Sequence, residues 1–298
     1  MKKVLYFIAV SASLALTACS SSKAIQKEMG LQLYSIRHLI GDANKFATNG
    51  DSILKMLADQ GYTSVEAANY RDGKLYGMEP AAFKASVEKA GLKALSTHTN
   101  RNLSKEEIEA GAPNEATLKW WDECIAAHKA AGMKYIVAPN QPFPNTQKEM
   151  KVWCDYYNTV GKKCAEAGMN FGYHNHAKEF THKIEGKVMY DFMLENTDPE
   201  YVFFEMDVYW AVMGKVSPVD YFKRYPGRFK LLHIKDWKEI GQSGMVGFDA
   251  IFRNAEIAGV ENIVVEIEAF ENKDMMKGVG QCAEYLQNAD FVKASYKK

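Results

Sequence analysis

The 298-residue sequence predicts an α/β fold, a single (β/α)₈ TIM barrel, on the strength of three observations. Amphipathic segments end five times at a glycine that is soon followed by an apolar run, the pattern of alternating helices and strands. Eight apolar runs are present in all, and this number and the chain length are typical of such barrels. No GxGxxG or Walker loop follows the first run, which disfavours an open doubly wound sheet.

The N-terminus predicts an export signal that lies outside the barrel. Lys2 and Lys3 precede an apolar run over residues 4–16, which is too short to serve as a stable transmembrane helix. Residues 16–19, Leu-Thr-Ala-Cys, resemble the bacterial lipobox, in which the cysteine becomes the lipidated first residue of the mature protein. We therefore expect a lipoprotein of the cell envelope, anchored through Cys19 and facing the periplasm or sitting in the outer membrane.

The rest of the chain predicts one domain without an internal linker. We expect a signal peptide over residues 1–19, a tether over 20–28 and the barrel over 29–298. The chain has 37 basic and 37 acidic residues, so its net charge of +0 offers no electrostatic footprint for nucleic acid or an anionic membrane surface. The lipid anchor is then the single expected membrane contact, and homo-oligomerisation stays open.

Four cysteines remain after the anchor, and the sequence favours buried, free thiols. Export permits disulfides, and four cysteines allow three pairings. Cys154 and Cys164 are ten residues apart on one expected helix, about 15 Å along its axis, which is too far for a bond between them. No spacing resembles a CxxC metal site. We expect these two, with Cys124 and Cys282, to act as small hydrophobic residues.

The elements follow one another in a regular order. The helices before Gly61, Gly91, Gly132, Gly168 and Gly259 are expected to end there, because glycine adopts the left-handed conformation after a helix. Helix starts are indicated by Pro80, by Ser217 before Pro218, and by a Thr146 to Glu149 capping box. The expected strands are residues 29–34, 64–67, 93–98, 135–138, 170–176, 202–208, 230–235 and 262–268.

Polar side chains collect at the ends of these strands, where barrels of this class carry their active sites. Four of the seven histidines lie at the ends of the expected strands. The period-two spacing places three pairs on common strand faces: Glu205 with Asp207, His233 with Lys235, and Glu266 with Glu268.

Buried carboxylates and imidazoles are costly unless they are paired or bound to a cation. The sequence therefore predicts a divalent metal ligated by His174, Asp207, His233 and Glu266. These nitrogen and oxygen ligands suit Mn²⁺, Co²⁺, Zn²⁺ or Mg²⁺. A hydrogen-bonded pair of Asp207 and His233 without metal is the alternative.

At these residues the sequence resembles the xylose isomerase-like barrel superfamily of sugar isomerases and epimerases, inosose dehydratases and endonuclease IV-type enzymes. Its sugar epimerases hold a metal with Glu, Asp, His and Glu on strands five to eight. Asp207, His233 and Glu266 match the last three positions, and His174 stands where the epimerases have Glu. Epimerases use two carboxylates on opposite faces of the reacting carbon, and this chain keeps one of the pair.

The Gly-Tyr-His-Asn-His run at 172–176, with Glu179 after it, resembles instead a branch with dehydratases and lyases that act on oxidised sugars. That resemblance implies a metal-dependent lyase that removes a proton α to a keto-sugar carbonyl, by β-elimination of 3-keto-glycosides or by dehydration. The alternatives are a sugar isomerase or epimerase and a non-catalytic sugar-binding lipoprotein. Endonuclease activity is disfavoured by the neutral chain.

For this chemistry the expected base is His176, with Lys235 and Glu268 as competitors. The expected partner is a small-molecule sugar or glycoside. The residues expected to contact it or to support the ligands are Tyr34, Arg37, Glu66, His98, Glu179, Trp210 and Trp237.

Overall fold

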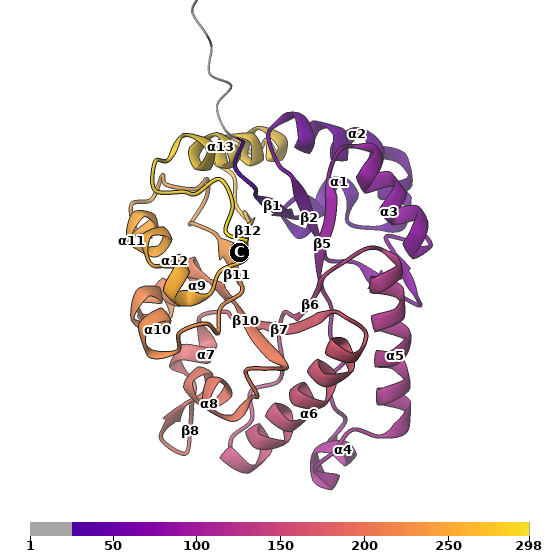
Figure 1. Cartoon of the computed structure of the whole chain (residues 1–298), viewed down its shortest axis with the longest axis vertical. Coiled ribbons are helices and arrows are strands. Elements are labelled where there is room, and N and C mark those ends of the chain that lie inside the picture. The colour runs from indigo at the N-terminus through magenta and orange to yellow at the C-terminus, as the bar shows by residue number, and fades with distance from the viewer. Residues whose placement is uncertain (1–25, 298) are drawn as a thin grey trace, which may run out of the picture.

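A computed structural model describes residues 26–297 and confirms the barrel. Within these residues eight parallel strands close a ring in the order β1-β12-β11-β10-β7-β6-β5-β2, with helices around it (Figure 1). The strands are β1 Gly30–Gln32, β2 Ser64–Ala67, β5 Lys93–His98, β6 Tyr135–Ala138, β7 Asn170–His174, β10 Val202–Asp207, β11 Leu231–Ile234 and β12 Asn262–Val265.

Three strands have the predicted bounds, and the other five end before the predicted residue. The chain leaves the sheet early at the mouth because polar side chains take over the backbone hydrogen bonds there. After β1, for example, the chain enters a short 3₁₀ helix, η1 Leu33–Ile36, in which Tyr34 N–H donates to Gln32 Oε1. His176, Lys235 and Glu268 consequently lie on loops beyond the strands.

The helices cover the outside of the barrel, and their ends follow the sequence signals. All five glycines expected after helices have positive φ, and Pro80 and Pro218 open their helices. Thr146 caps its helix by accepting from Glu149 N–H, but the Glu149 carboxylate accepts from Asn145 N–H, so the capping box is incomplete. The longer helices are α2 Ala43–Asp59, α3 Pro80–Lys89, α5 Glu115–Ala130, α6 Gln147–Glu166, α8 Met189–Asn196 and α13 Met275–Asn288.

Shorter elements complete the connections. They are α1 Arg37–Ile40, α4 Lys105–Ala110, α7 Lys178–Thr181, α9 Val208–Met213, α10 Pro218–Arg224, α11 Phe248–Arg253 and α12 Ala255–Ala258, with the hairpins β3 Tyr70–Arg71, β4 Lys74–Leu75 and β8 Lys183–Ile184, β9 Lys187–Val188. At the mouth, α9 directly follows β10, α7 begins a few residues after β7, and α1 follows η1.

The apolar core has two parts. The larger part packs the helices against the outside of the sheet. The smaller part consists of Tyr135, Val137, Phe203 and Leu231 with the half-buried Leu95. Because Phe203 shares a strand face with Glu205 and Asp207, this second cluster fills the barrel interior on the N-terminal side of the site.

The four cysteines after the anchor are buried and form no disulfide within residues 26–297, as expected. Cys154 and Cys164 both lie on α6.

The signal peptide and Cys19 lie outside the described residues, as does most of the expected tether. Lys27 and Glu28, which were assigned to the tether, form hydrogen bonds with the C-terminal segment of the barrel. Lys27 Nζ donates to Leu286 O and Ala289 O, and Glu28 N–H donates to Ala294 O. These two residues therefore contact the C-terminal segment of the chain. No helix in the described part of the chain is long and apolar enough to cross a bilayer.

Candidate active site

A cavity of about 330 Å³ opens at the C-terminal ends of the strands. It brings together seven of the residues predicted for the site. Its lining consists of Tyr34, Ala68, His98, Pro139, Asn140, His174, His176, Trp210, Glu266 and Glu268.

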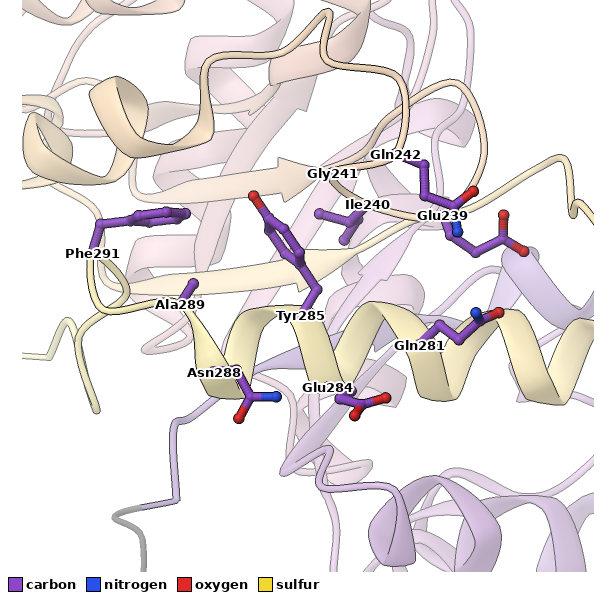
Figure 2. Close-up of a pocket in the computed structure, with 10 residues that line it drawn as sticks. All are labelled: Glu239, Ile240, Gly241, Gln242, Gln281, Glu284, Tyr285, Asn288, Ala289 and Phe291. Carbon is purple, nitrogen blue, oxygen red and sulfur yellow. The ribbon is translucent and has the colours of Figure 1, made fainter.

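A larger hollow of about 520 Å³ lies elsewhere, between α13 and the loop that follows β11. Figure 2 shows the rings of Tyr285 and Phe291 on one side of it and the side chains of Glu239 and Gln242 on the other. None of the strand-end residues in the described chain lines this hollow. Its size therefore does not outweigh the chemistry of the mouth, and we take the smaller cavity as the candidate site.

Four potential ligands converge beside the cavity. One nitrogen or oxygen atom each from His174, Asp207, His233 and Glu266 lies within 4.8 Å of the others, and all four residues are buried. Asp207 Oδ1 accepts from Trp210 N–H at 2.8 Å. Asp207 Oδ2 and His233 Nδ1 are buried with no hydrogen-bond partner in the described residues. Unsatisfied buried lone pairs of this kind fit a bound cation.

The pKa values of the four ligands show which protons a cation would have to displace. Burial works against the charged form of His233, but Glu205 and Glu66 raise the pKa of this imidazole well above its usual value. Burial raises the pKa of Asp207 to about 7, and burial lowers the pKa of His174 well below its usual value. Burial opposes the charged form of Glu266 too, but Lys235 lowers the pKa of this carboxyl. A divalent cation favours a deprotonated Asp207 and a neutral His174, because both must offer lone pairs to bind it.

A deeper layer of polar groups lies beneath the four ligands. His98 Nε2 and Glu205 Oε2 are 2.7 Å apart, and His174 Nδ1 is 3.2 Å from the same oxygen. His233 Nε2 is 2.7 Å from Glu66 Oε1. Glu66 also accepts from the side chains of Gln32 and Ser96.

Glu66 was expected to contact the substrate or to support the ligands, and it is fully buried below the cavity, where it contacts His233. Glu205 was seen to share a face with Asp207 and was given no role, although a carboxylate inside an apolar strand is itself a signal.

The expected base and its competitors have different surroundings. His176 lines the cavity, and burial lowers its pKa, so the ring is neutral. Lys235 Nζ lies 2.8 Å from Glu268 Oε1 and 3.5 Å from Glu266 Oε2. Burial works against the ammonium, but Glu266 and Asp207 raise the pKa of Lys235. The neighbouring carboxylates therefore favour the ammonium form of Lys235.

Three further predicted residues do not line the cavity. Glu179 is buried behind it, where its carboxylate accepts from Tyr173 Oη at 2.9 Å and from the N–H of the expected base at 3.0 Å. Arg37 lies over the Tyr34 ring at 4.1 Å and faces a neighbouring groove. Trp237 is 58% exposed, away from the cavity lining. Glu179 thus supports the base, while Arg37 and Trp237 stand at the periphery.

Comparison with known proteins identifies the family. The family model "Xylose isomerase-like TIM barrel" matches residues 54–293. The chain belongs to this family. The resemblance seen at the strand ends is thereby confirmed for the barrel.

The chain is similar to enzymes that act on sugars. A sugar phosphate isomerase/epimerase from Parabacteroides distasonis ATCC 8503 superposes with a TM-score of 0.80 and 35% identity, over 94% of this chain and 100% of that one. Inosose dehydratase of Geobacillus kaustophilus is 25% identical over 207 residues, which cover 62% of this chain and 61% of the relative. The match thus spans less than two thirds of the dehydratase.

A more distant neighbour carries a metal. The IOLI protein, solved with a binding zinc atom, shares the fold at a TM-score of 0.63 and 14% identity, over 89% of this chain and 97% of that one.

Proposed function

We propose that this protein is a divalent-metal-dependent carbon–oxygen lyase that acts on keto-sugars, with β-elimination of 3-keto-glycosides as the first choice and dehydration of keto-sugars beside it. The observation that carries the proposal is the difference in protonation between the two candidate bases near the cavity. His176 is a neutral imidazole at the cavity wall, whereas the neighbouring carboxylates favour the ammonium form of Lys235. His174 occupies the position of a carboxylate in the epimerase pattern. A single base suffices for elimination.

The residues present fit a metal, which His174, Asp207, His233 and Glu266 would hold. When bound, a divalent cation acts as a Lewis acid that polarises a carbonyl and acidifies the neighbouring C–H group.

The side chains then divide the proton transfers among themselves. A ring nitrogen of His176 takes the proton from C2 of the sugar, and Glu179 holds the backbone of this residue in place. The C1–O bond breaks as the C1–C2 double bond forms, and His176 returns its proton to the departing oxygen. Lys235 fixes Glu268 at the cavity wall, where this carboxylate can accept hydrogen bonds from sugar hydroxyls.

The charges at the cavity favour a sugar without phosphate. Among the described residues that line it, none is Arg or Lys, and two are the carboxylates Glu266 and Glu268. A phosphate is bound most strongly by Arg or Lys, and nearby carboxylates repel it. We therefore extend the proposal to unphosphorylated substrates, despite the phosphate in the name of the Parabacteroides relative.

The second candidate is a sugar isomerase or epimerase with the same ligands, and the name of the 35%-identical relative favours it. A non-catalytic sugar-binding lipoprotein is a third possibility. Anchoring through Cys19 in the cell envelope belongs to the proposal as well and rests on the sequence of the first 19 residues.

Incubation with a 3-keto-glycoside, with and without chelator, tests the choice. We expect release of the free aglycone and an unsaturated keto-sugar, followed by NMR, and no release after chelation. Interconversion of free aldoses and ketoses, with glycosides left intact, contradicts the lyase and supports the second candidate.

A substitution of His176 tests its assignment as the catalytic base. His176→Ala should lower turnover by about 10²–10⁴-fold while the bound metal is retained. His38→Ala is the matched control, because this exposed histidine lies in the groove beside the mouth and not in the cavity. Full turnover of His176→Ala would move the base to Glu268.

A further inference from the structure

The deeper layer of imidazoles and carboxylates can be interpreted in two ways, as a second metal cage or as a hydrogen-bonded support. Atoms of His98, His174, Glu205 and His233 also lie within 4.8 Å of one another. Ligands of a four-coordinate zinc with bonds of about 2.0–2.1 Å are separated by about 3.3 Å. The separations of His174 Nδ1 and His233 Nε2 from Glu205 Oε2 are both 3.2 Å and fit either arrangement. His98 Nε2 lies 2.7 Å from the same oxygen, as in a charge-assisted hydrogen bond, and this shortest distance favours a support.

The support determines which ring nitrogens carry hydrogen. An ionised carboxylate only accepts hydrogen bonds. His174 Nδ1 faces Glu205 Oε2 at 3.2 Å, and His233 Nε2 faces Glu66 Oε1 at 2.7 Å, so each of these nitrogens carries the hydrogen. Nε2 of His174 and Nδ1 of His233 remain for the four-ligand set.

The free nitrogen of His233 supports this assignment. His233 Nδ1 is buried with no hydrogen-bond partner in the described residues, and it lies 3.6 Å from Glu266 Oε2. An imidazole that donates through one nitrogen and has the other free is oriented for a metal, as in carboxylate–histidine–zinc triads.

Glu205 is placed beside a proposed metal ligand by the strand register. Glu205 pairs with His174 in the register of β10 and β7. The chain therefore carries a carboxylate on the neighbouring strand at the level of His174, and this carboxylate contacts the ligand set through the imidazole.

We infer that Glu205 is a positioning residue that fixes the ring of His174 for the metal, and that Glu66 fixes His233 in the same way. The inference rests on the metal site of the proposed function, but it does not depend on the reaction that the site performs.

Metal titration without substrate tests the role of Glu205. We expect Glu205→Gln to weaken the binding of Co²⁺, followed by its visible absorption, and of Mn²⁺, followed by calorimetry, by about 10–100-fold. The control is Glu239→Gln, which neutralises another carboxylate that is 2% exposed and accepts from Glu271 N–H beside the hollow of Figure 2. The control should bind Co²⁺ like the wild type.

A second measurement starts from the wild type. In zinc-loaded protein with ¹⁵N-labelled histidine, NMR should show His174 protonated at Nδ1 and His233 protonated at Nε2. Glu205→Gln should disturb the signals of both His174 and His233, because each has a ring nitrogen 3.2 Å from Glu205 Oε2. Glu66→Gln should disturb the signal of His233 and leave that of His174. A purely structural role of these carboxylates would not produce this difference between the two variants.

The outcomes separate this inference from the proposed reaction. Unchanged Co²⁺ affinity in Glu205→Gln, or His174 protonated at Nε2 in the wild type, overturns the inference and leaves the lyase standing. The expected affinities and tautomers, with glycosides left intact, support the inference and contradict the lyase. A wild type that binds neither Co²⁺ nor Mn²⁺ overturns the inference together with the metal site.

Discussion

On β10, Phe203 packs its ring against Tyr135 in the lower interior of the barrel, at a centroid distance of 5.5 Å. Two and four residues further along the same strand face, Glu205 and Asp207 are buried among imidazoles. On β11, the apolar Leu231 is likewise followed on its face by His233. On both strands, the inward-facing side chains therefore change from apolar to ionisable within two residues.

The lower interior and the mouth of the barrel contribute differently to stability and to chemistry. Apolar groups in the lower interior are removed from water and favour the fold. Charged groups at the mouth are removed from water as well, at a cost that partners or a cation must offset. We therefore expect substitutions in the lower interior to change the free energy of unfolding and those at the mouth to change binding and turnover.

The largest effect is expected at the mouth, for Asp207→Asn. The amide keeps the shape and loses the charge that a metal needs, so turnover should fall at least about 10³-fold, or about 4 kcal/mol. Burial already disfavours the Asp207 carboxylate, so the melting temperature of the metal-free protein should not fall. Retained metal binding, measured by elemental analysis, would contradict this account of the mouth.

The converse experiment is Phe203→Ala. Removal of a buried ring that contacts the lower interior should cost about 3–5 kcal/mol of unfolding free energy, read from urea denaturation. The Co²⁺ affinity of the folded fraction should stay within about threefold of wild type, because the Phe203 ring precedes Glu205 by two residues on β10 and lies below the ligands. Loss of metal binding at unchanged stability would show that the two regions are not separable.

A pH effect is expected from Glu179, whose pKa burial raises to about 7. The folded-state value exceeds the ordinary one, so its stabilising contribution is complete below about pH 4.5 and is lost as the pH rises to 7. Glu179→Gln mimics the protonated form and should be more stable than wild type above pH 7, by on the order of 3 kcal/mol. Identical slopes of stability against pH for both proteins would contradict the assignment.

The smallest effects are expected for two tryptophans. Trp210 lines the cavity with its ring 5.8 Å from that of His176, and Trp210→Ala should raise KM about 3–10-fold, from about 0.5–1.5 kcal/mol of aromatic contact. Trp237 is 58% exposed and away from the lining, so Trp237→Ala should change KM less than about twofold. Equal effects would place both rings at the substrate.

The fold could be predicted because local signals agree with it. Glycines after five helices and apolar runs between them determine the alternation, and all five glycines have positive φ. The bounds of several strands were predicted too long, since the side-chain hydrogen bonds that replace the sheet at the mouth depend on residues distant in sequence. Gln32 illustrates this: its amide accepts from Tyr34 N–H and donates to Glu66.

The site was predictable where the strand order determines position. His174, Asp207, His233 and Glu266 were assigned from parity and strand ends, and the structure brings them within ligand distance. Depth was not predictable in this way. Glu66 and His98 both stand on strands that lead to the mouth, but Glu66 is fully buried below it while His98 reaches the cavity. The height of a side chain depends on the tilt and stagger of the strands, which sequence spacing does not give.

Anomalous scattering from crystals soaked in Mn²⁺ tests the central claim most directly. We predict one strong peak at the mouth, bounded by His174, Asp207, His233 and Glu266, and no peak in the deeper layer of Glu66, His98 and Glu205. A crystal with no peak at the mouth, or with its peak in the deeper layer, would contradict the account.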